Sequence, residues 1–285
     1  MAHRTREAPQ GAAAWSVLAI SVIAMALIFV LPLAVVFVEA FQDGVGRWAD
    51  AVSDRDTLAA IQLTLLVLAV VVPFHAVFGI ASAWALTRYD FPGKGVLLTI
   101  VDLPFAISPI VSGLLFVLLF GARGWFGEVL GDHGIQIVYA VPGVILATLF
   151  VTLPFVTREL VPLLEAQGRE EEEAAASLGA GGWQILTRVT LPRIKWGVLY
   201  GCVLCTARAA GEFGAVSVVS GHIRGETNTL PLHVEILYNE YDVVAAFAVA
   251  SLLALSGLLT LALKAWLERR ARLARLPATA LPAEI

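Results

Sequence analysis

Long uninterrupted apolar runs dominate the pattern of hydrophobic and polar positions along the chain. The clearest run, from Trp15 to Val38, contains no charged residue, and five others lie at about 58–87, 96–120, 138–157, 197–220 and 243–266. A helix needs about 20 mostly apolar residues to cross the hydrocarbon core of a bilayer. The pattern therefore predicts an all-α membrane protein with six transmembrane helices over residues 15–266, between tails at 1–14 and 267–285.

The composition supports this class of protein. Hydrophobic residues make up 59% of the chain and charged residues 15%, whereas soluble domains carry about 25% charged residues. The first run follows Arg4 and Arg6, as a signal peptide would, but it is longer than the about 7–15 apolar residues of a signal-peptide core. We therefore expect an uncleaved membrane anchor.

The basic residues indicate an orientation. Of the 19 Lys and Arg residues, all but five fall on one alternate set of connections together with both tails. Arg208 lies inside the fifth run, and the other connections contain only Arg47, Arg55, Arg123 and Arg224. Because short cytoplasmic loops are enriched in Lys and Arg, both termini are predicted to be cytoplasmic.

Several other classes of function lack support in the sequence. The net charge is −4 and no basic block stands apart from the membrane-flanking clusters, so nucleic-acid binding is not expected. Cys202 and Cys205 lie three apart within the fifth run without a second ligand pair, which favours packing over a metal or redox site. The phosphate-binding pattern G-x-x-x-x-G-K-[ST] is absent, so any ATP must be hydrolysed by another subunit.

The connection from about Arg158 to Trp196 is long enough to carry function. Its Glu- and Ala-rich portion, 170–178, favours helix, and the glycines at 179, 181 and 182 favour a turn. A second short helix over 183–189 is expected to end before Leu191 and Pro192, because proline disfavours helix in the residue before it. The resulting hairpin either packs on the bundle or docks on a partner.

A motif in this connection distinguishes these alternatives. The spacing E-A-A, three residues, G, nine residues, I/V, one residue, L-P is matched by Glu173, Ala174, Ala175, Gly179, Val189, Leu191 and Pro192. It resembles the EAA loop of permeases in ATP-binding-cassette importers, with Val189 where the pattern often has Ile. The resemblance implies a type I importer fold whose coupling loop, about 165–195, inserts into an ATPase subunit that binds ATP and Mg. No cofactor is expected in this chain.

Three further segments resemble the sulfate and molybdate permeases, at 78–94, 102–114 and 207–241. The last, with GEFGAVSVVSG followed by IRGETNTLPL, is most similar to the W-type sulfate permease family. This resemblance implies a multi-pass protein of the bacterial plasma (inner) membrane that translocates sulfate or thiosulfate. It also implies a heterodimer with a T-type permease paralogue, two cassette ATPase subunits and a sulfate/thiosulfate-binding protein. Molybdate or another oxyanion is the alternative substrate.

A small set of polar residues lies inside the predicted spans. Asp102, Arg208 and Glu212 are ionisable, and such residues usually face a bundle interior or an aqueous path. Arg208 and Glu212 are four apart, so they can pair on one helix face, either to line an anion path or only to fix the fifth span. Hydroxyls for a wet path are offered by Ser108, Ser112, Ser217 and Ser220. His75 stands where these relatives would have an uncharged amide, and we expect a core histidine at a partner contact.

Two rival functions remain open from the residues alone. A secondary anion transporter would use buried carboxylates at repeated broken helices, but no internal repeat is present. An intramembrane enzyme would need a nucleophile motif such as G-x-S-x-G, which is absent. At the opposite side of the membrane from the coupling loop, the segment 221–242 is the candidate for a half-helix near the face that docks the binding protein.

Overall fold

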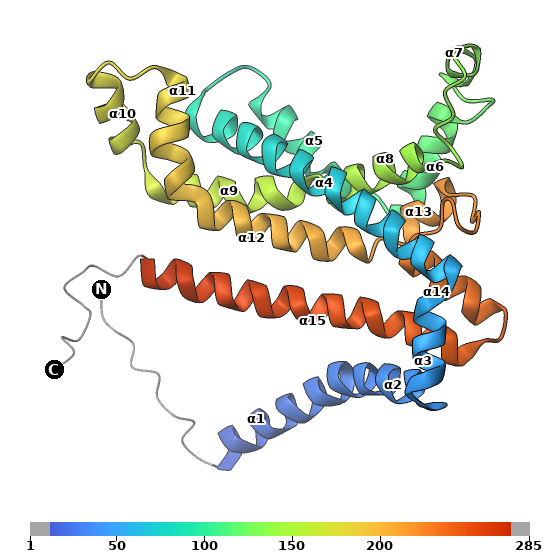
Figure 1. Cartoon of the computed structure of the whole chain (residues 1–285). Coiled ribbons are helices and arrows are strands. Elements are labelled where there is room, and N and C mark those ends of the chain that lie inside the picture. Colours follow the sequence, from blue (N-terminus) through green and yellow to red (C-terminus); the bar gives the residue numbers. More distant parts are fainter. Residues whose placement is uncertain (1–11, 275–285) are drawn as a thin grey trace.

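The computed structural model describes residues 12–274, and helices are the only regular secondary structure in this part of the chain (Figure 1). The predicted tails therefore fall mostly outside the described residues. In chain order the helices are α1 Ala12–Met25, η1 Ala26–Val30, α2 Leu31–Ala40, α3 Gly44–Ser53, α4 Arg55–Arg88, α5 Lys94–Ala106, α6 Pro109–Phe120, α7 Gly127–Asp132, α8 Val141–Thr152, α9 Pro154–Gln167, α10 Glu170–Ser177, α11 Gly182–Ile185, η2 Leu186–Thr190, α12 Leu191–Ala210, α13 Gly214–Val219, α14 Leu230–Asn239 and α15 Val243–Ala274.

The long helices coincide with the apolar runs. Within the described part of the chain, four are long and apolar enough to cross a membrane, at Ala14–Ala40, Arg55–Arg88, Val141–Gln167 and Val243–Arg270. The third run is not one straight helix, because the helix axis bends by 111° between α5 and α6. Counting this bent pair as one span gives up to five. The all-helical class is confirmed, and the six spans and their orientation stay predictions.

The fifth run also differs from a single span. It is divided into α12 and α13 by a break at 211–213, and α12 carries Arg193, Lys195 and Arg208. In the third run the break lies at 107–108, just before Pro109. Ser108 has φ −59° and ψ 137°, which is the extended conformation that a following proline favours.

The two breaks lie against each other. A Cβ atom added at Gly214 would lie 3.0 Å from Cβ of Pro109, and one added at Gly113 would lie 2.7 Å from the carbonyl oxygen of Ala215. Helices in membranes approach this closely only where a small residue leaves room. Glycine therefore brings α6 and α13 together, backbone to backbone.

Replacing Gly113 with Leu is expected to lower the melting temperature of the purified subunit in detergent. The new side chain would collide with the backbone of α13, and overpacking of this kind typically costs about 1–3 kcal/mol. Gly257→Leu is the matched control, because a Cβ at Gly257 meets nothing within 4 Å. Equal melting temperatures for the two variants would contradict the close contact of α6 with α13.

The core of the bundle is formed where α4, α9 and α12 pack together. A Cβ added at Gly79 would lie 2.5 Å from Cγ1 of Val156, and one at Gly201 would lie 3.2 Å from Cα of Val156. His75 is fully buried in this region, and its Nε2 lies 2.9 Å from Oγ1 of Thr152. The expectation of a core histidine is thus confirmed, while a partner contact at His75 stays a prediction.

Proline changes the helix geometry in two places instead of ending a helix. At η2 the N–H of Leu191 donates to the carbonyl of Leu186, and at η1 the N–H of Leu31 donates to Ala26. Each of these π-turns comes just before a proline, Pro192 or Pro32. The wider turn relieves the clash of the proline ring with the carbonyl four residues earlier. The predicted helix end before Leu191 is therefore wrong: the chain stays helical from Gly182 to Ala210.

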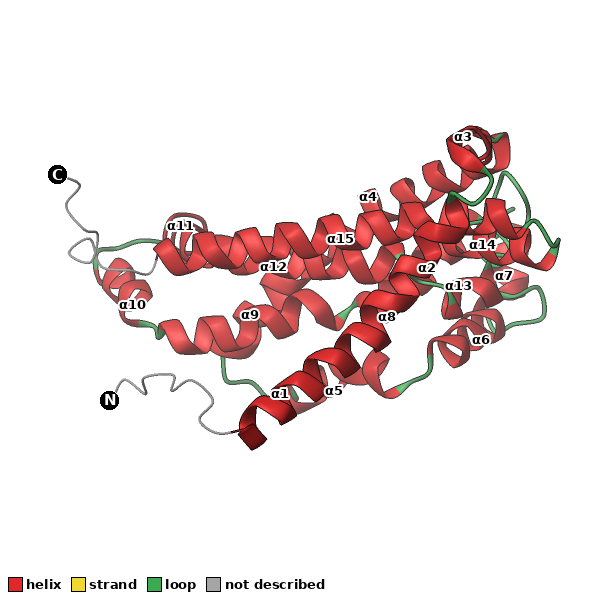
Figure 2. Ribbon diagram, turned by 90° about the horizontal axis from the view of Figure 1, so that it is seen from below, coloured by secondary structure: helices red, strands yellow, loops and turns green. Residues whose placement is uncertain are grey.

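The helices place two kinds of structure at opposite ends of the bundle (Figures 1 and 2). We call the end with α10 and α11 the hairpin end, and the end with α3, α7 and α14 the loop end. The segment 221–242 contains the ten-residue helix α14, and its place as an outer half-helix near a docking face stays a prediction. The span Ala14–Ala40 has none of its most apolar window buried within the chain, and α1 stands away from α15 in Figure 1.

Candidate coupling site and translocation path

A helical hairpin, residues 169–190, projects from the hairpin end and contains most of the EAA motif. Its first helix, α10, ends in a turn where Gly179 has φ +86°. The N–H groups of Leu178, Gly179 and Ala180 donate to the carbonyls of Ala174, Ala176 and Ala175. A left-handed glycine after the last helical turn closes a helix in this way. The sequence thus folds locally into two antiparallel arms around Gly179.

The outer surface of the hairpin is apolar where a solvated loop would be polar. Leu178 is 90% exposed and Trp183 is 76% exposed. Of the motif residues, Glu173, Ala174, Gly179 and Pro192 are exposed, whereas Ala175, Val189 and Leu191 are half-buried. Exposed Leu and Trp side chains at the tip of a projecting element are typical of a docking surface.

An ion pair that the sequence did not suggest fixes this hairpin to the bundle. Arg88, at the end of α4, donates from Nε to Glu172 Oε2 at 2.6 Å and from Nη2 to Oε1 at 3.2 Å. Thr190 donates to the same Oε1 at 2.7 Å. Arg88 also bonds the carbonyls of Leu164 and Gly168. One guanidinium therefore joins α4, α9 and the hairpin.

Two further contacts restrict the same hairpin. Arg169 donates to the carbonyl of Thr87 at 2.5 Å, and Arg193 pairs with Glu171 at 3.1 Å. The first arm of the hairpin is thus attached both to the end of α4 and to the start of α12.

The predicted pair of Arg208 and Glu212 is present at the end of α12. Arg208 Nη1 lies 2.5 Å from Glu212 Oε2, and the Glu212 side chain is 1% exposed. The other oxygen of Glu212 accepts the N–H of Ala215, at the start of α13, at 2.9 Å. The carboxylate therefore spans the helix break, while Arg208 stays partly exposed beside it.

Replacing Arg208 with Ala is expected to impair transport much more than Cys205→Ala, which removes a neighbouring buried side chain. Without Arg208 the carboxylate of Glu212 is left buried without its charge partner, and breaking a buried pair in this way costs about 3–5 kcal/mol. Initial uptake rates of the two variants at equal membrane levels provide the measurement. Equal, mild effects would contradict a specific role for the pair.

Asp102 has a partner from another helix. Arg158 Nε, in α9, lies 2.7 Å from Asp102 Oδ1, and both side chains are partly exposed. The guanidinium of Arg158 also lies 4.9 Å from the ring centre of Phe105. Asp102 is therefore part of an ion pair between α5 and α9.

The four candidate serines flank the two breaks on α6 and α13, but most of their hydroxyls have local partners. Ser112 donates to the carbonyl of Ser108, and Ser217 donates to that of Gly214. Ser220 accepts the N–H of His222. Ser108 is exposed at the start of α6, and its side chain makes no capping bond. Ser108 is therefore the member of the set with a hydroxyl available to a solute.

Ion pairs also join the segments of the loop end. Arg224 pairs with Glu240 and lies 3.8 Å from Asp56, and Arg47 lies 2.6 Å from Asp242. The hydrogen bond from Arg224 holds the pKa of the Glu240 carboxyl below its usual range. These contacts connect α3, α4 and α14 across the loop end.

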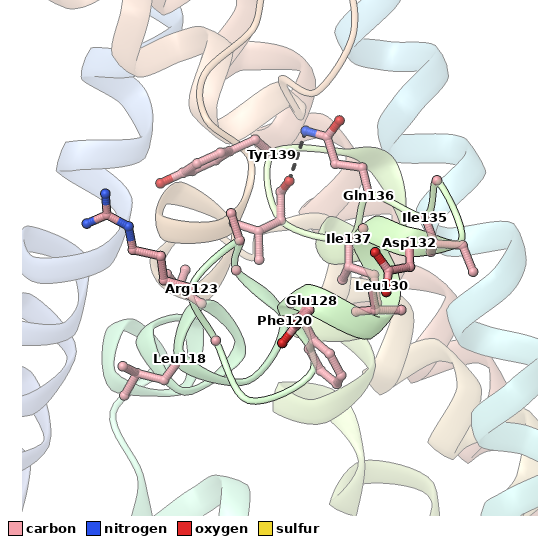
Figure 3. Close-up of a pocket in the computed structure, with 18 residues that line it drawn as sticks. Leu118, Phe120, Arg123, Glu128, Leu130, Asp132, Ile135, Gln136, Ile137 and Tyr139 are labelled. Atoms are coloured by element: carbon pink, nitrogen blue, oxygen red, sulfur yellow. Dashed lines mark hydrogen bonds between the residues drawn. The ribbon is translucent and has the colours of Figure 1, made fainter.

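A pocket of about 940 Å³ lies in the segment 117–139, which connects α6 through α7 toward α8 (Figure 3). Its lining is mainly apolar, with Arg123, Glu128 and Asp132 among the charged residues. Gln136 donates to the carbonyl of Val138 at 3.2 Å within it. None of the candidate path or coupling residues lines this pocket, so it is separate from both sites.

Comparison with known proteins identifies relatives that are all membrane components of transport systems. Residues 75–273 match the family described as "Binding-protein-dependent transport system inner membrane component". The chain is 49% identical over 256 residues to the "Sulfate transport system permease protein CysW" of Escherichia coli K12, covering 90% of this chain and 88% of that protein. It is 51% identical over 253 residues to CysW of Synechocystis, covering 89% and 92%. The protein CysT of Escherichia coli K12 is 37% identical over 85% of this chain and 87% of its own length.

A solved structure supports the fold. A chain of a bacterial alginate ABC transporter, solved in complex with a periplasmic protein bound to alginate pentasaccharide, superposes with a TM-score of 0.72. The match covers 90% of this chain and 93% of the other at 18% identity. The arrangement of helices is thus that of an ABC transporter chain.

Proposed function

Because the chain belongs to the family of binding-protein-dependent transport system inner membrane components, we propose that it is a permease subunit of an ATP-binding-cassette importer that carries sulfate or thiosulfate into the cytoplasm. The observation that carries the substrate is the identity of about half of all positions with CysW proteins, over nine-tenths of the chain. The chain itself is a multi-pass component of the inner membrane. ATP and Mg bind to a partner ATPase.

The proposed topology has six spans with both termini in the cytoplasm. The bent pair α5–α6 is one span, and α12 with α13 is another. The distribution of Lys and Arg supports this orientation, which puts the hairpin end in the cytoplasm and the loop end outside. The breaks at 107–108 and 211–213 then lie within the membrane, where irregular backbone is tolerated beside protein or water.

The hairpin is the proposed coupling site. The exposed Leu178 and Trp183 insert into a groove of the ATPase, and the motif residues Glu173, Ala174, Ala175, Gly179, Val189, Leu191 and Pro192 shape the two arms. Because Arg88 and Glu172 attach the hairpin to α4, closure of the ATPase subunits moves α4 and α12 as rigid rods. The 34 residues of α4 rise about 50 Å at 1.5 Å each, enough to connect the two faces of the membrane.

The proposed path runs beside the two breaks. Moving a bare dianion into an apolar medium would cost tens of kcal/mol, so the path holds water. Ser108 and Arg208 offer a hydroxyl and a positive charge to the anion, and Glu212 limits the attraction of Arg208. Asp102 fixes α5 to α9 through Arg158, and Ser112, Ser217 and Ser220 border the path with hydroxyls that bond within their own helix or turn.

The proposed partners bind at different parts of the molecule. A T-type paralogue similar to the 37% identical CysT forms the second half of the pathway, since one set of these helices leaves α1 exposed from Trp15 to Met25. Two cassette ATPase subunits bind at the hairpin end. A sulfate/thiosulfate-binding protein docks at the loop end, near α14.

Uptake in reconstituted vesicles tests this function. The vesicles contain this subunit, its T-type partner and the ATPase, with the binding protein outside and labelled sulfate as the substrate. We expect ATP-dependent uptake that thiosulfate inhibits and molybdate does not. Uptake blocked mainly by molybdate would indicate that molybdate is the preferred substrate. Uptake without ATP would contradict the assignment to an ATP-driven importer.

A further inference from the structure

A cluster of two tryptophans and two basic residues lies where α12 and α15 pack together at the hairpin end. The rings of Trp196 and Trp266 meet edge to face, with centres 6.5 Å apart. Lys195 Nζ lies 5.6 Å from the ring centre of Trp196, and the guanidinium of Arg270 lies 5.3 Å from that of Trp266. The four side chains form one continuous patch with a positive charge at each end.

Among the described residues, the positive charges of this patch have no carboxylate partner. Within residues 12–274, no carboxylate lies within 4 Å of Lys195 or Arg270, whereas Arg88, Arg158, Arg193 and Arg208 each have one. The nearby Lys264 differs, because its Nζ lies 5.3 Å from the ring centre of Tyr200 and it interacts electrostatically with the carboxylates of Glu159 and Glu268. Lys195 and Arg270 are both exposed, and Trp266 is 49% exposed.

The depth of the patch matches the surface of a bilayer. The uncharged part of α15, from Val243 to Leu263, is about 30 Å long at 1.5 Å per residue, which is the thickness of the hydrocarbon core. Trp266 and Arg270 follow directly, at the level of the lipid headgroups. Tryptophan is favoured at this level, and unpaired basic residues there attract anionic lipids.

We propose that Lys195, Trp196, Trp266 and Arg270 form a binding site for the headgroup of an anionic phospholipid at the cytoplasmic surface. The headgroup lies along the patch, where the ammonium at one end and the guanidinium at the other attract its negative charge, and the two indoles contact the glycerol and the upper acyl chains. The proposal depends on the proposed function only for naming the leaflet. It predicts a lipid bound beside the start of α12, next to the hairpin.

Quenching of tryptophan fluorescence by brominated lipids tests the site in the complete importer. The vesicles contain phosphatidylcholine with increasing fractions of either brominated phosphatidylglycerol or brominated phosphatidylcholine. The chain has seven tryptophans, so the signal of the patch is the difference between the wild type and a Trp196→Phe/Trp266→Phe variant. We expect half-maximal quenching at a much lower fraction of the anionic lipid.

Charge removal provides the matched comparison. A Lys195→Gln/Arg270→Gln variant should weaken the preference for the anionic lipid about fivefold for each charge removed. A Lys94→Gln/Arg269→Gln variant removes the same charge from other positions at the hairpin end and should keep the preference. Equal quenching by both lipids in the wild type, or an unchanged preference in the first variant, would overturn the proposal. Quenching by neither lipid would also overturn it, because an ATPase subunit would then cover the patch. Since both leaflets contain the lipid, the result does not depend on which face of the membrane is cytoplasmic. The fluorescence signal also requires no sulfate uptake, so it can be read even if the proposed function is wrong.

Discussion

Replacing Glu172 with Ala is expected to lower ATP-driven sulfate uptake at least tenfold while leaving the subunit in the membrane. Glu172 and Arg88 form a nearly buried pair, with side chains 12% and 8% exposed, and Thr190 bonds the same carboxylate. Removing one member of a buried pair costs about 3–5 kcal/mol. A loss of this size loosens the hairpin where it meets α4, although the bond from Arg169 to the carbonyl of Thr87 remains, so less of the movement of the ATPase would reach the membrane helices.

The measurement compares uptake with ATP hydrolysis in the same vesicles. For Glu172→Ala we expect hydrolysis to continue while sulfate uptake falls at least tenfold. Glu170→Ala is the matched control, because Glu170 is exposed on the same helix and makes no ion pair within the described residues. An Arg88→Ala/Glu172→Ala variant should be no worse than Arg88→Ala alone, since the two side chains act as a unit. Normal uptake by Glu172→Ala would contradict the role of the pair in coupling.

Replacing Trp183 with Ala is expected to release the ATPase from the permease. Trp183 is 76% exposed, so its loss leaves the folded subunit unchanged, and tryptophans that anchor an interface typically contribute 2 kcal/mol or more, roughly thirtyfold in affinity. The measurement is the amount of ATPase that purifies with the tagged permease, together with sulfate uptake. We expect both to fall.

Trp125→Ala is the control for this prediction. Trp125 is also exposed, at 85%, but it lies between α6 and α7 at the loop end, away from the proposed ATPase site. It should retain the ATPase in full. Equal retention of the ATPase by Trp183→Ala and Trp125→Ala would contradict docking through the hairpin.

The sequence predicted what depends on local pattern. Apolar runs located the long helices, and the spacing of Arg208 and Glu212 predicted their ion pair, because residues four apart share a helix face. An apolar run does not show whether the helix that it forms is straight. The run at 96–120 therefore did not predict the 111° bend between α5 and α6, although Ser108 and Pro109 lie near its centre. Pro192 was taken for a helix end, whereas the π-turn at η2 accommodates it.

Contacts between segments that are far apart along the chain could not be predicted from the sequence. Arg88 and Glu172 are 84 positions apart, and Asp102 and Arg158 are 56 apart. A single sequence with four consecutive glutamates at 170–173 gives no reason to choose Glu172 over its neighbours. The motif drew attention to Glu173, which is exposed. The glutamate that holds the hairpin is the one whose side chain turns toward α4 and η2.

Photocrosslinking from position 183 shows what the tip of the hairpin contacts in the assembled importer. A photoreactive amino acid replaces Trp183 in the assembled importer, and the crosslinked products are identified by mass spectrometry. We expect a crosslink to the cassette ATPase, and none to it when the same amino acid replaces Trp125. Crosslinks from position 183 only to lipid or to this chain itself would contradict the assignment of the hairpin as the site where ATP hydrolysis is coupled to transport.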